Sequence, residues 1–74
     1  MRDTPGATIR IARPRHGLPP VVYGNWIVGP EEWPHSDKAA HIRYVLSELR
    51  AEEPEAGWRI ESRGTHSGWH PVED

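Results

Sequence analysis

Three arginines recur at short spacing near the N-terminus of this chain, at Arg10, Arg13 and Arg15. Two aromatic residues, Tyr23 and Trp26, follow them. Guanidinium groups bind phosphates, and aromatic rings offer surfaces on which bases stack. This segment therefore indicates nucleic-acid binding as one hypothesis, although three arginines are few for a domain of that class.

Two histidines, His66 and His70, have the spacing of many zinc ligands. A helix would place both side chains on one face, but Gly68 lies between them and Pro71 follows, so a helix is not expected there. No cysteine supports a metal site. The sequence carries no phosphate-binding glycine loop and no serine–histidine–aspartate pattern, so we expect no metal and no cofactor.

Length and composition indicate one small domain spanning residues 1–74. The four Trp and two Tyr are residues that disordered chains usually lack. The absence of cysteine fits a reducing compartment, and we expect a cytoplasmic protein. No apolar run approaches the roughly 20 residues of a membrane span, and no secretory signal is recognised, so no membrane association is expected.

The net charge of −2 is unevenly distributed. Residues 1–30 carry a net charge of +3, residues 31–56 carry −4, and residues 57–74 carry −1. Such an asymmetry favours a charged partner over a neutral one, with solvated surface charges as the plain alternative. A small domain without disulfides also gains stability from association, so a homodimer is a further expectation.

The hydrophobic pattern predicts the helix and strands that must position these residues. Together these elements indicate an α+β fold. One amphipathic helix packs on a short, mainly antiparallel sheet in the order β-β-α-β, with a final short strand expected near Trp69 to Val72. Ala39, Ile42, Val45, Leu46 and Leu49 form the apolar stripe of the helix. Ser36 or Asp37 is its N-cap, and Pro54 ends it. The predicted segments are a frayed lead at 1–6, strands at 7–12, 21–28 and 58–63, and the helix at 37–52.

Within the strands, alternation predicts which side chains are buried. Ile9 and Ile11 share one face of the first strand, and Gly24 marks a bulge in the second strand, whose buried face is ambiguous. In the last strand Ile60 and its neighbours at even spacing point inward, whereas Arg59, Glu61 and Arg63 point outward. Residues 13–20 are expected to form a proline-rich loop. The predicted core comprises Ile9, Ile11, Val22, Trp26, Val28, Ile42, Val45, Leu46, Leu49, Trp58 and Ile60.

The stretch from Ile42 to Pro71 resembles the core of HicA-type mRNA interferase toxins. It reads as a helix, then Ala56-Gly57-Trp58, a strand, Gly64-Thr65-His66, the aromatic Trp69, and His70-Pro71. The resemblance implies a fold similar to a double-stranded-RNA-binding domain. It also implies RNA cleavage with His66 as general acid or base, and phosphate contacts from Arg59 and Arg63. About thirty residues carry this resemblance; the first thirty residues have no counterpart in that family, and its later strand and second helix are absent here.

The leading hypothesis is a non-enzymatic binding protein. Trp33, Tyr44 and Trp69 lie off the predicted apolar faces, and Glu48 lies one helical turn from Tyr44. Exposed aromatic residues beside charges are typical of interface hot spots. We therefore expect a larger host protein or complex to be the main partner, as for accessory proteins of phages and mobile elements, with RNA or DNA as the alternative partner.

Overall fold

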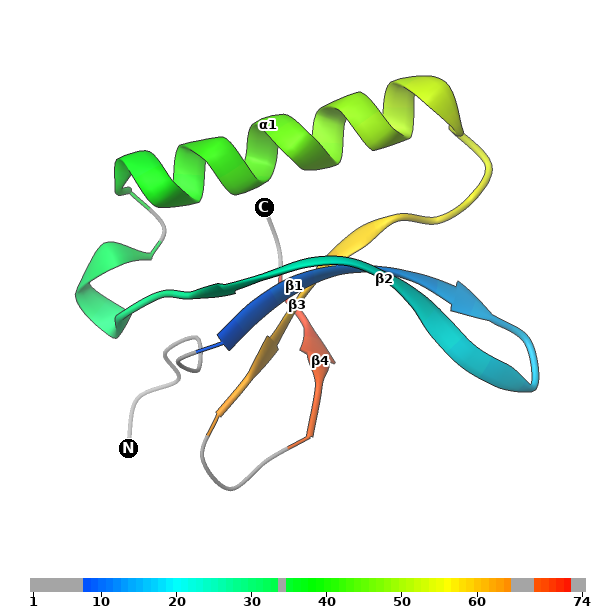
Figure 1. Cartoon of the computed structure of the whole chain (residues 1–74), viewed down its shortest axis with the longest axis horizontal. Coiled ribbons are helices and arrows are strands. Elements are labelled where there is room, and N and C mark those ends of the chain that lie inside the picture. Colours follow the sequence, from blue (N-terminus) through cyan, green and yellow to red (C-terminus); the bar gives the residue numbers. More distant parts are fainter. Residues whose placement is uncertain (1–7, 34, 65–67, 73–74) are drawn as a thin grey trace.

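The structure, a computed structural model, describes residues 8–33, 35–64 and 68–72. Its elements are β1 (Thr8–Arg15), β2 (Leu18–Ile27), a short 3₁₀ helix η1 (Pro30–Glu32), α1 (Asp37–Glu52), β3 (Arg59–Arg63) and β4 (His70–Pro71). The strands form one antiparallel sheet in the order β2-β1-β3-β4. The helix α1 lies along one face of this sheet (Figure 1). The predicted α+β class is confirmed, and the expected short final strand is β4.

The helix α1 has the bounds predicted from the sequence because its start and stop signals are local. The hydroxyl of Ser36 accepts a hydrogen bond from the backbone N–H of Ala39 at 3.1 Å, so Ser36 is the N-cap. The buried stripe consists of Ala39, Ile42 and Leu46. Tyr44, on the opposite side of the helix, is 61% exposed.

The hairpin of β1 and β2 is longer than predicted. A turn at His16 and Gly17 joins the strands, and Gly17 has a positive φ of 72°, which glycine adopts without steric cost. The expected loop over residues 13–20 is therefore wrong. Proline is tolerated in β2 because this strand lies at the edge of the sheet. Pro14 is tolerated in β1 because the pairing of β1 with β3 ends at Ala12.

The predicted bulge at Gly24 is confirmed. The register of β1 against β2 shifts at this residue, which has a φ of 77°. A Cβ atom at position 24 would lie 2.7 Å from the Cη2 atom of Trp26, so both the backbone and the packing require glycine.

Most of the predicted core is buried between the sheet and α1, with three differences. Val22 is 40% exposed because its register partner is Ala12, on the sheet face turned away from the helix. Trp33 joins the core with 8% exposure. Trp26, Val45 and Leu49 pack against the core but are only partly buried.

The two faces of the sheet differ in composition. Ile9, Ile11 and Ile60 belong to the core beneath α1. Strand alternation then places Arg10, Arg59, Glu61 and Arg63 on the other side, as predicted for the last three. We call the sheet face turned away from α1 the open face. None of the helices in the described residues is long and apolar enough to cross a membrane.

Candidate functional site

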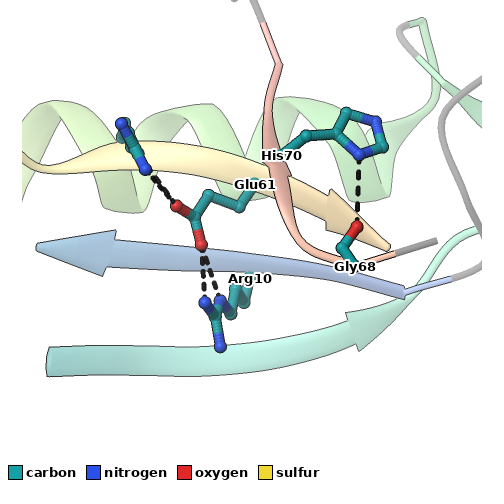
Figure 2. A network of polar contacts seen from close by, with 5 residues as sticks. Arg10, Glu61, Gly68 and His70 are labelled. Carbon is teal, nitrogen blue, oxygen red and sulfur yellow. Dashed lines mark hydrogen bonds and ion pairs between the residues drawn. The ribbon is translucent and has the colours of Figure 1, made fainter. Parts of the chain in front are cut away.

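A buried carboxylate lies at the centre of the open face. Glu61 on β3 is the direct register partner of Arg10 on β1, and its side chain is only 4% exposed. Its Oε1 atom accepts hydrogen bonds from Arg10, with Nε at 2.8 Å and Nη2 at 2.7 Å (Figure 2). Its Oε2 atom accepts from Arg59 with the same two distances. Both oxygens therefore receive charge-assisted bonds, and two guanidinium groups are held in fixed orientations.

The protonation state of Glu61 follows from a competition between burial and charge. Burial raises the pKa of this carboxyl, but hydrogen bonds from Arg10 and Arg59, together with their positive charges, outweigh it. The pKa of Glu61 therefore lies below its usual value. The carboxylate is charged at neutral pH, and both ion pairs are intact there.

An aromatic ring completes the cluster. The guanidinium carbon of Arg10 lies 4.1 Å from the ring centroid of Trp69, and that of Arg63 lies 5.9 Å from it. These are cation–π distances. Arg10 is thus held by Glu61 and by Trp69, the residue that immediately precedes β4. We call Arg10, Arg59, Glu61, Arg63 and Trp69 the arginine–tryptophan cluster.

The members of this cluster differ in their access to solvent. The side chain of Arg10 is 15% exposed and that of Arg59 is 43% exposed, while Arg63 is an exposed residue. Glu61 accepts from the Nε and Nη2 groups of both Arg10 and Arg59. Three guanidinium groups and one carboxylate give the cluster a net charge of +2, although the whole chain carries −2.

The predicted N-terminal patch of arginines is not one surface. Arg13 follows Arg10 by three residues, an odd spacing that places the two on opposite faces of β1. The guanidinium of Arg13 lies 5.7 Å from the ring of Trp58, and its Nη1 atom lies 3.7 Å from Glu53. Arg15 donates from Nε to the carbonyl oxygen of Pro19 at 2.8 Å. Arg10, Arg13 and Arg15 therefore do not share one face of β1, and their role in binding nucleic acid stays a prediction.

The predicted partner surface is also divided. Trp33 is buried in the core, with the guanidinium carbon of Arg43 5.0 Å from its ring, so its expected exposure is wrong. Tyr44 and Glu48 are exposed on α1, as predicted. Trp69 belongs to the cluster on the other side of the sheet, so these residues do not form one continuous surface.

The histidines add no site in the described part of the chain. His66 lies outside the described residues, so its catalytic role stays a prediction. The Nδ1 atom of His70 lies 3.3 Å from the carbonyl oxygen of Gly68 (Figure 2). Across residues 8–33, 35–64 and 68–72, no group of three or more metal-ligating side chains comes together.

Glu61 is the residue that sequence reasoning missed as part of a site. The signal was present in the alternation of Arg59, Glu61 and Arg63, which places an acid between two bases on one face. Its importance depends on the register that sets Arg10 opposite it, and no local pattern specifies that register.

Comparison of this chain with protein-family models, with curated proteins and with solved structures finds no match. The chemistry of the arginine–tryptophan cluster is therefore the basis on which a function can be proposed, and the resemblance to HicA-type toxins stays a prediction.

Proposed function

We propose that the protein is a non-enzymatic binding module whose open face holds a single strand of nucleic acid. The observation that carries this proposal is the convergence of Arg10, Arg59 and Arg63 with Trp69. These arginines come from two strands far apart in the sequence, and the alternative predicted surface around Tyr44 gathers no comparable group.

The chemistry of the cluster suits a phosphate backbone. Arginine presents a planar fork of donors that matches phosphate, and it stays charged at all physiological pH values. Arg59 and Arg63 are the more exposed cations, so they are the expected phosphate contacts. Arg10 and Glu61 lie deeper and hold the arrangement rigid, which reduces the entropy lost on binding.

A single strand fits this surface better than a duplex does. Strands lie about 4.8 Å apart, so a four-stranded sheet is roughly 15–20 Å wide, which suits a few nucleotides. Sheet surfaces with aromatic residues and arginines bind unstacked bases, whereas reading a duplex groove requires an element that enters the groove. Arg10 covers part of the ring of Trp69, and the part of this ring that stays exposed is the expected surface for one base.

The test is fluorescence anisotropy with labelled single-stranded RNA, single-stranded DNA and a duplex of equal length, each at several salt concentrations. Two or three phosphate contacts predict a slope of log affinity against log salt of about −1.4 to −2.1 for single strands. Arg63→Gln should weaken binding and make the slope shallower by about 0.7. Arg15→Gln removes the same charge away from the cluster and serves as the matched control.

Two results would contradict the proposal. One is the absence of single-strand binding at low salt. An acidic protein that binds the same arginines, while single strands do not, would be one form of this result. The other is an equal loss of affinity in Arg15→Gln and Arg63→Gln, which would show that only total charge matters.

The same RNA samples test the enzymatic alternative. The HicA-like hypothesis predicts RNA cleavage that His66→Ala abolishes, whereas a binding module leaves the RNA intact.

We further propose a cytoplasmic location, because the chain has no cysteine. An origin as an accessory protein of a phage or mobile element is part of the proposal on grounds of size alone.

A further inference from the structure

The edge strand β2 has an unusual composition for its position. None of its ten residues, from Leu18 to Ile27, is charged. Among the described residues, five large hydrophobic side chains are exposed, and four of them lie on β2: Leu18 (59%), Val22 (40%), Tyr23 (50%) and Ile27 (76%). Edge strands of monomeric proteins usually carry charged residues that prevent pairing with another chain. Pro19, Pro20 and the bulge at Gly24 limit pairing along this edge, but β2 carries no protecting charge.

We propose that β2 pairs antiparallel with β2 of a second copy of this chain. An uncharged strand can face its own copy without repulsion between like charges. The charges lie instead beyond its two ends, with Arg15 and His16 before the strand and Glu31 and Glu32 after it. Lys38 also lies at the second end, where its Nζ atom donates to the carbonyl oxygen of Ile27 and is 3.8 Å from Glu32, so the net charge of Glu31, Glu32 and Lys38 is −1. Antiparallel pairing brings the basic end of one copy to the acidic end of the other, twice per dimer. This complementarity favours a second copy over a partner of a single charge sign.

The prolines restrict the register of this pairing. Pro19 and Pro20 have no N–H to donate, which leaves Val21 to Ile27 as the pairing segment. The centre of this segment is Gly24, the residue at the bulge. Pairing about Gly24 places Val21 opposite Ile27 of the second copy. The turn at His16 and Gly17 then lies beside Glu31 and Glu32 of that copy.

The dimer would form one surface from two open faces. Antiparallel pairing of identical edge strands requires a two-fold axis normal to the sheet, so both open faces lie on the same side. Two copies of β3 would then be separated by five strand spacings, roughly 24 Å. This inference does not depend on nucleic-acid binding, because it follows from β2 alone.

Sedimentation equilibrium of the full chain tests the dimer. The wild-type protein is expected to shift, as concentration rises, from the monomer mass of 8.4 kDa to twice that value. Ile27→Lys places a charge in the paired edge and should remain monomeric. Tyr44→Lys adds the same charge at an exposed residue of α1, away from β2, and this control variant should dimerise like the wild type. Circular dichroism establishes that each variant is folded.

A charge exchange tests the register, with substitutions at exposed residues only. Arg15→Glu and Glu31→Arg should each weaken the dimer by about fivefold, since two symmetric surface pairs are lost. The double variant should restore wild-type affinity. The proposal is overturned by a wild-type protein that stays monomeric, by a dimer that Ile27→Lys leaves intact, or by a double variant as weak as the single ones.

Discussion

The substitution Glu61→Gln should destabilise the protein strongly, although it changes a single atom of the side chain. It replaces one carboxylate oxygen by an amide nitrogen, which is a donor directed at a guanidinium group that also donates. Arg10, whose side chain is 15% exposed, then loses its counter-charge in a largely dry position. Arg59, at 43% exposure, can recover water as a partner.

The magnitude follows from this difference in exposure. Removing one partner of a buried ion pair costs about 3–5 kcal/mol, whereas a solvent-exposed pair is worth about 0–1 kcal/mol. Since the site is buried on one side only, we expect a loss of about 3 kcal/mol, nearly all of it from Arg10. A chain of this length has a free energy of unfolding of roughly 4–11 kcal/mol. The variant should therefore melt roughly 10–25 °C below the wild type.

Urea unfolding followed by tryptophan fluorescence measures this loss, with Arg59→Gln as the matched control. The control should cost less than Glu61→Gln, because Glu61 keeps Arg10 as its counter-charge. The double variant Glu61→Gln/Arg10→Met, which removes both buried charges, should recover part of the loss. A free energy of unfolding for Glu61→Gln within about 0.5 kcal/mol of wild type would refute the reasoning. A larger loss in Arg59→Gln than in Glu61→Gln would refute it as well.

Three further predictions concern stability. The pKa of the Glu61 carboxyl is lower in the folded state than its ordinary value of 4.5. The ion pairs of Glu61 therefore stabilise the fold fully above pH 4.5, and this stabilisation is lost as the pH falls through the folded-state pKa. Urea midpoints measured from neutral pH downward should therefore fall more steeply below that value in wild type than in the Gln variant. Gly24→Ala should lower the free energy of unfolding by at least about 1–2 kcal/mol in thermal melting, because the φ of residue 24 is 77° and the new methyl group meets Trp26. Gly68→Ala, which has open space around the new methyl group, is the control and should be neutral. Trp33→Ala should lower the free energy of unfolding by about 3–5 kcal/mol, whereas Tyr44→Ala should change it by less than about 0.5 kcal/mol. Equal losses in urea unfolding would contradict the burial described for the two residues.

The helix and the bulge were predictable because their signals are local. Ser36 caps α1 by bonding a backbone group three residues away, and the apolar stripe fixes which side of the helix is buried. Gly24 indicated a bulge because glycine adopts a positive φ without steric cost. None of these features needs knowledge of which strands are neighbours.

The hairpin and the cluster were not predictable because they depend on the order of strands. Pro14, Pro19 and Pro20 suggested a loop, and they are compatible with strands only where a neighbouring strand is missing. Likewise, Arg10 becomes a partner of Glu61 through a pairing that spans fifty-one positions of the sequence. The predicted surface around Trp33 was wrong because a residue between two elements can fold back onto the core.

The placement of charges, and not their total, explains how a chain with a net charge of −2 carries a cluster with a net charge of +2. Away from the open face, Arg13 lies beside Glu53 and Lys38 lies beside Glu32. On the open face the strands β1 and β3 bring three arginines around a single acid, Glu61. That acid is deeply buried against the two guanidinium groups it holds, while Arg63 is exposed, with its guanidinium carbon 5.9 Å from the ring centroid of Trp69. An approaching phosphate therefore meets a local excess of positive charge that the composition does not reveal.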